Sequence, residues 1–100
     1  MLIAHVRFPV APEHRHIATE ALVASVETVR AMPGCIAFHP VHDPIDAGIL
    51  GVVHEWQTEA DFAAYTASDA FRTFGEKIRP LMTGTPVSRR FRSDLIEVVN

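Results

Sequence analysis

The stretch from residue 49 to residue 74 constrains the fold most, because its hydrophobic period changes within a few residues. Up to Trp56, apolar or aromatic side chains recur at every second position, which is the period of a β-strand with one buried face. Thr58 followed three residues later by Asp61 is typical of a helix N-terminus. The residues on the buried strand face are Leu50, Val52, His54 and Trp56.

The helical region that follows extends from about Glu59 to Met82 and contains an interruption. Ser68 before Asp69 is a second N-cap signal, so we expect one helix to end and another to begin there. Beyond this point large apolar residues recur every three or four positions, which predicts a buried stripe. They are Phe71, Phe74, Ile78 and Leu81.

The rest of the chain supplies three more strands and one more helix. Leu2–Phe8 alternates as a strand, and a helical period begins after Pro12 and ends before Gly34. Cys35–Val41 predicts a second strand, and Pro40 within it indicates the edge of a sheet. Val87–Val99 predicts a long final strand.

This β-α-β-β-α-β order predicts an α+β, ferredoxin-like domain over residues 1–100, with a four-stranded antiparallel sheet and two helices on one face. The other face then carries Ile3, His5 and Arg7 from the first strand. A half-apolar open face on so small a domain predicts a homodimer, and the last strand could reach over the neighbouring subunit.

Composition weighs against several classes of function. The net charge of −3 argues against a general attraction to nucleic acid, and no apolar run reaches the roughly 18 residues of a membrane span. With no signal peptide and Cys35 as the single cysteine, a reducing, cytoplasmic setting is expected. The histidine spacings do not suit zinc, and no nucleotide or flavin fingerprint is present, so no cofactor is expected. Arg89, Arg90 and Arg92 are interpreted as a solvated strand edge.

Several short motifs, in this order and spacing, resemble the antibiotic biosynthesis monooxygenase family of the dimeric α/β-barrel superfamily. They are the Pro33-Gly34-Cys35 turn, the Asp43-Pro44 pair, Glu55 and Trp56 at a strand end, and an acidic and aromatic helix start. The resemblance covers about Leu2 to Phe91. It implies a homodimer with one pocket per subunit, between the sheet and its helices. Family members include cofactor-independent monooxygenases of anthrones, quinol monooxygenases and haem-degrading enzymes.

The resemblance also allows particular residues of this chain to be compared with the functional positions of family members. Trp56 matches the tryptophan of the anthrone oxidisers, whereas Val52 and Phe62 stand where those enzymes carry asparagine and tyrosine. Tyr65 stands where many quinol-type members carry histidine. Val6 replaces the first-strand asparagine of the haem degraders, which argues against haem degradation. The expected substrate-binding side chains are Val6, Val52, Phe62 and Phe74.

We therefore expect a cofactor-independent monooxygenase acting with dioxygen on a quinol or polycyclic phenol. Such an enzyme must deprotonate its substrate, hold the anion and exclude water. The expected catalytic residues are His54 as proton acceptor, Trp56 orienting the ring, and Tyr65 holding a substrate oxygen. Each also has a purely structural interpretation, as a hydrogen-bonded strand histidine, a core tryptophan and a helix-surface tyrosine. The alternative functions are a non-catalytic ligand-binding dimer and an isomerase or cyclase with His54 as base.

Overall fold

The computed structural model describes residues 1–100 and has the predicted order of elements, with the second helical region divided in two. The antiparallel sheet has the strand order β2-β3-β1-β4, which confirms the ferredoxin-like arrangement. Pro40 lies in β2, an edge strand, as predicted. The elements are β1 (Leu2–Pro9), α1 (Arg15–Arg30), β2 (Cys35–His42), β3 (Ile49–Trp56), α2 (Glu59–Thr66), α3 (Asp69–Ile78) and β4 (Val87–Arg92), with single 3-10 turns at Pro12–His14 and Arg79–Leu81.

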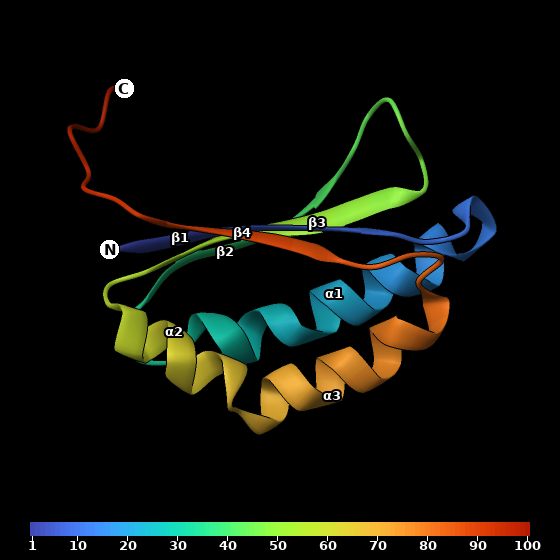
Figure 1. Ribbon diagram of the computed structural model, residues 1–100, viewed down its shortest axis with the longest axis horizontal. Coiled ribbons are helices and arrows are strands. Elements are labelled where there is room, and N and C mark those ends of the chain that lie inside the picture. The colour runs from blue at the N-terminus through green and yellow to red at the C-terminus, as the bar shows by residue number, and fades with distance from the viewer.

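The three helices cover one face of the sheet and leave the other face open (Figure 1). The core lies between the two layers, because alternate residues of β1 and β3 and one stripe of α1 are buried there. The largest fully buried side chains are Phe8, Leu22, Val29, Leu50, Trp56 and Ile78. Trp56 has no exposed surface, so it closes the core at the end of β3.

Both predicted helix starts are confirmed by their cap hydrogen bonds. The Thr58 hydroxyl accepts the Asp61 backbone N–H at 3.0 Å, and the Ser68 hydroxyl accepts the Phe71 backbone N–H at 3.2 Å. Each bond satisfies an N–H that the first helical turn leaves unpaired. The Ser68 cap separates α2 from α3 and lets α3 take a new direction along the sheet (Figure 1).

The expected long final strand is shorter than predicted. β4 ends at Arg92, which pairs with Leu2, the first residue of β1. Beyond that point β1 offers almost no further backbone partners. Two hydrogen bonds form the last link, from the Ser93 N–H to the Met1 carbonyl at 2.9 Å and from the Met1 ammonium group to the Ser93 carbonyl at 2.8 Å. The following segment extends away from the body (Figure 1) and exposes four large apolar side chains, Leu95, Ile96, Val98 and Val99.

The open face of the sheet mixes apolar and basic side chains. Ile3 pairs with Phe91 and His5 with Arg89, so these residues share the face that the helices leave uncovered. Phe91 packs against the His5 ring at 5.6 Å and carries the Arg89 guanidinium above it at 5.2 Å. None of the helices has both the length and the apolar character that a membrane crossing requires.

Candidate functional site

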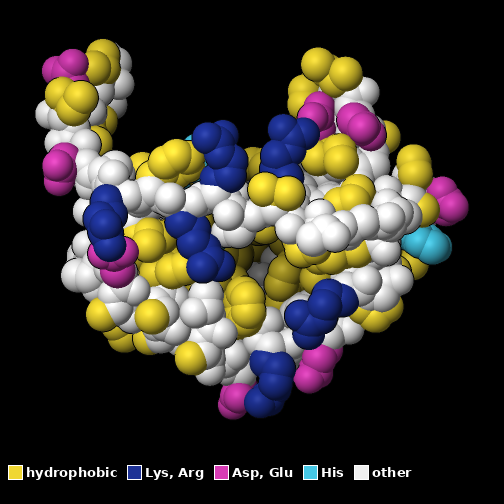
Figure 2. Space-filling view, in the orientation of Figure 1, with side chains coloured by type: hydrophobic (Ala, Val, Ile, Leu, Met, Phe, Trp, Pro, Cys, Tyr) yellow, Lys and Arg dark blue, Asp and Glu magenta, His cyan; other side chains and the backbone are white.

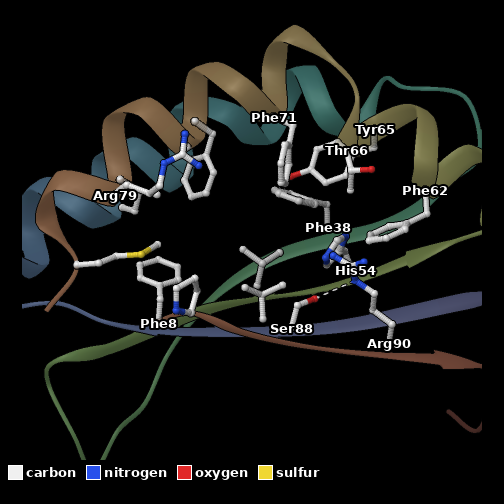
Figure 3. Close-up of a pocket in the computed structure, with 17 residues that line it drawn as sticks. Phe8, Phe38, His54, Phe62, Tyr65, Thr66, Phe71, Arg79, Ser88 and Arg90 are labelled. Atoms are coloured by element: carbon white, nitrogen blue, oxygen red, sulfur yellow. Dashed lines mark hydrogen bonds between the residues drawn. The ribbon is translucent and has the colours of Figure 1, made fainter. Parts of the chain in front are cut away.

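A cavity of about 240 Å³ lies between the sheet and the α2–α3 pair (Figure 3). Its lining is mainly aromatic and aliphatic, and it contains no Asp or Glu side chain. The lining residues are Val6, Phe8, Phe38, Val52, His54, Phe62, Tyr65, Thr66, Phe71, Phe74, Gly75, Ile78, Arg79, Met82, Pro86, Ser88 and Arg90. Such a cavity suits a small aromatic molecule that carries few polar groups.

His54 is one of the polar residues that line this cavity, and a hydrogen bond from Trp56 fixes its orientation. The Trp56 indole Nε1–H donates to His54 Nδ1 at 2.9 Å, and both side chains are buried. Since Nδ1 accepts this hydrogen bond, the neutral imidazole carries its proton on Nε2. Nε2 makes no hydrogen bond within the chain. It is not a buried atom either, because the only buried side-chain nitrogen or oxygen without a hydrogen-bond partner is Ser93 Oγ. Nε2 is therefore accessible, and since His54 lines the cavity, it is open to the cavity.

The surroundings keep His54 and Tyr65 uncharged near neutral pH. Burial, then the positive charge of Arg90, then that of His5, lower the pKa of His54 to about 4. Burial, with a smaller contribution from Cys35, raises the pKa of Tyr65 to about 12. His54 and the Tyr65 phenol are therefore hydrogen-bond donors rather than acids or bases at pH 7.

Aromatic rings surround His54. The centroids of Phe38, Phe62 and Tyr65 lie 5.5, 5.6 and 5.8 Å from the imidazole centroid. Tyr65 is stacked on Trp56 at 5.1 Å with an interplanar angle of 20°. Edge-to-face and stacked contacts of this kind hold the rings in fixed orientations, which preforms the cavity.

The structure brings most of the predicted site residues together. Val6, Val52, His54, Phe62, Tyr65 and Phe74 all line the cavity. Trp56 does not, because it lies fully buried behind His54 and its N–H is already engaged. The expected contact between Trp56 and a substrate ring is therefore corrected: Trp56 positions His54. Phe71, expected in a buried stripe, is partly exposed and lines the cavity.

Two arginines at the rim of the cavity, Arg79 and Arg90, were not predicted from the sequence as site residues. Arg90, interpreted as part of a solvated edge, points toward the helices and holds its guanidinium carbon 4.9 Å from the Phe62 ring centroid. Alternation could have placed it there, since Arg90 lies opposite Ala4 of β1, whose side chain is buried in the core. Arg79, in the turn after α3, carried no sequence signal of its own. No group of three or more His, Cys, Asp or Glu side chains is placed to hold a metal ion.

Fold and cavity together define a small ferredoxin-like α+β domain that encloses an aromatic pocket between its two layers. The family model for antibiotic biosynthesis monooxygenases matches residues 1–77, so the chain belongs to that family. Among curated proteins no significant sequence match was found.

Solved structures agree with this assignment at the level of the fold. A protein from Deinococcus radiodurans, described provisionally as an antibiotic biosynthesis monooxygenase, superposes with a TM-score of 0.90 at 17% identity, over 100% of both chains. One from Nitrosomonas europaea, described in the same way, gives 0.87 at 17% identity over 93% of this chain and 98% of the other. Rv0793 from Mycobacterium tuberculosis gives 0.86 at 18% identity over 98% of each chain.

Proposed function

We propose that the protein is a cofactor-independent monooxygenase whose substrate is a small quinol or phenol bound in the cavity beside His54. The observation that carries the proposal is a buried, neutral imidazole, fixed by Trp56 and open at Nε2 to an aromatic cavity. Family membership supports the reaction class. The volume of about 240 Å³ favours one or two rings over a larger polycycle, because drug-sized pockets begin at roughly 300 Å³.

His54 acts in this proposal as a hydrogen-bond donor to the substrate oxygen. This role differs from the proton acceptor expected from the sequence. The only lone pair on a neutral imidazole lies on the unprotonated nitrogen, which here accepts the Trp56 N–H. A pKa of about 4 also makes His54 a weak base at neutral pH. The same two facts argue against an isomerase or cyclase that uses His54 as its base.

The reaction then depends on stabilising the substrate anion. The Nε2–H of His54 and the positive charge of Arg90 face the same end of the cavity, so both favour the deprotonated hydroxyl and lower its pKa. The proton leaves to water, and the electron-rich anion transfers electrons to dioxygen. The substrate supplies all four electrons: one oxygen atom enters its ring, the other leaves as water with two hydrogens of the substrate, and the product is a hydroxyquinone from a quinol or a quinone from a phenol. Tyr65 contributes a second donor, and the apolar lining limits the access of bulk water.

Two matched variants test the role of His54. Asn places its side-chain oxygen where His54 has Nδ1, so His54→Asn keeps an acceptor for Trp56 and removes the Nε2–H donor. Gln places its amide nitrogen near the position of Nε2, so His54→Gln keeps a donor. We expect oxygen uptake with a panel of benzene and naphthalene quinols to fall about 100-fold in His54→Asn and less in His54→Gln.

The measurement is oxygen consumption above the rate of autoxidation. Trp56→Phe, which frees Nδ1, is expected to lower uptake about tenfold by loosening the imidazole. Uptake that is unchanged in His54→Asn would remove His54 from the mechanism. No uptake with any quinol, together with ligand-induced shifts in melting temperature, would favour the non-catalytic binding protein.

The active form in this proposal is a homodimer assembled through the open sheet face. Val41, Val87 and Phe91 expose apolar surface there. The C-terminal segment and the loop between β2 and β3 both project on that side of the sheet (Figure 1). Ile45 at the tip of the loop is 95% exposed, which is costly unless a partner covers it.

A further inference from the structure

The cavity has a second charged end, formed by Arg79. Figure 3 shows Arg79 beside α3 at one end of the cavity, and His54 with Arg90 at the other. The five ion pairs of the protein involve Arg7, Arg72, Arg92 and His16, and none involves Arg79. With no acidic residue in the lining, the guanidinium has no internal counter-ion.

The position of the Arg79 guanidinium depends on Gly75. A Cβ atom at Gly75 would lie 2.7 Å from Arg79 Nη1 and 3.0 Å from Cζ, so the guanidinium lies directly against the bare backbone of α3. Gly75 is itself buried and lines the cavity, although glycine is a poor helix former. The missing side chain at Gly75 thus leaves space for the Arg79 guanidinium at the cavity rim. Gly75 lies one helical turn before Arg79.

The two ends of the cavity differ in what they can bind. At the His54 end a neutral N–H and the charge of Arg90 suit a hydroxyl that becomes an anion during the reaction. At the Arg79 end a planar guanidinium without a protein partner suits a group that is already anionic and planar, and a carboxylate matches its paired donors. Figure 2 shows Lys and Arg side chains on either side of the hollow.

We propose that Arg79 binds a carboxylate on the substrate and so selects aromatic hydroxy acids over neutral quinols. The carboxylate would lie on the part of the molecule distant from the hydroxyl that faces His54. The proposal depends on the proposed function only because both use the same cavity. It concerns ligand binding and does not require the oxygenation reaction to take place. Arg79 is a specificity-determining residue in this scheme.

The test compares two ligands that differ in one charge. A hydroxynaphthoate with its hydroxyl and carboxylate on different rings is measured against its methyl ester by titration calorimetry. The wild-type protein is expected to bind the acid about tenfold more tightly than the ester, and added salt is expected to narrow the difference. Arg79→Gln is expected to lose this discrimination by weakening binding of the acid alone, and Arg79→Lys to recover part of it.

Two further variants separate this role from a general effect of charge. Gly75→Ala is expected to reduce the discrimination while the protein stays folded, because the added methyl displaces the end of a flexible side chain. Arg89→Gln, on the open face and outside the cavity, is expected to leave both affinities unchanged. Equal affinity for acid and ester, no binding of either, or an equal loss of both in Arg79→Gln would each overturn the proposal. A failure to detect oxygen uptake would leave the binding result standing and overturn only the proposed reaction.

Discussion

At the scale of single residues, the burial of His54 makes the stability of the protein depend on pH. The pKa is about 4 in the folded protein and near 6.5 in the unfolded chain, so between these values only the unfolded chain takes up the proton. The free energy of unfolding is therefore expected to fall as the pH falls from about 6.5 to about 4. For this one group the loss is on the order of 3 kcal/mol.

Urea denaturation at several pH values measures this effect. The appropriate comparison is His54→Asn, which keeps an acceptor for Trp56 and cannot titrate in this range. We expect its free energy of unfolding to depend less steeply on pH than that of the wild type between pH 6.5 and 4. Equal slopes for the two proteins would mean that His54 is protonated as readily in the folded state as in the unfolded one.

The sequence identified six of the seventeen residues that line the cavity, but it did not show how deeply each predicted side chain is buried. Alternation in β3 correctly places Val52, His54 and Trp56 on one face. It does not distinguish a side chain that lines a cavity from one buried behind it, which is why Trp56 was expected to contact substrate. That distinction depends on how α2 packs across β3, a long-range contact that a periodic pattern does not encode.

At the scale of elements, the two N-caps hold α2 and α3 at the angle that shapes the cavity. Tyr65 of α2 and Phe71 of α3 meet edge-to-face at 5.3 Å across the Ser68 junction. Ser68→Ala and Thr58→Ala are each expected to lower the free energy of unfolding by about 1 kcal/mol, measured by urea denaturation. Thr73→Ala in the exposed interior of α3 is the control, and it is expected to raise the free energy of unfolding slightly, because alanine favours a helix more than threonine does.

Only Ser68→Ala is expected to alter ligand binding as well, because Thr58 caps a helix end that lies away from the junction. Its Oγ1 interacts with Asp61 at the start of α2. If both cap variants changed the affinity for ligand equally, α2 and α3 would have to move as one unit.

Both caps were predictable from the sequence, since short-range signals decide where a helix begins. The end of β4 was not, because it depends on where the partner strand β1 begins.

At the scale of the whole molecule, the open sheet face carries apolar side chains that a monomer would leave in water and that the proposed dimer would cover. Val41→Asp in β2 and Phe91→Asp in β4 each place a charge on this face, where the proposed interface would bury it without a partner. Each is expected to convert the proposed dimer into a monomer, measured by size-exclusion chromatography with light scattering. Removal of residues 94–100, which expose four large apolar side chains, is expected to weaken the dimer as well.

The control for these variants is Val23→Asp, because Val23 exposes similar apolar surface on α1, on the opposite side of the molecule. It is expected to leave the molecular mass unchanged. A wild-type protein that is monomeric at all concentrations would overturn the assembly, and so would dimers that survive both open-face charges. Since the cavity lies between the sheet and the helices of one subunit, dissociation by Val41→Asp is expected to leave the acid-over-ester preference in place. Loss of that preference in a folded monomer would show that the partner subunit shapes the binding site.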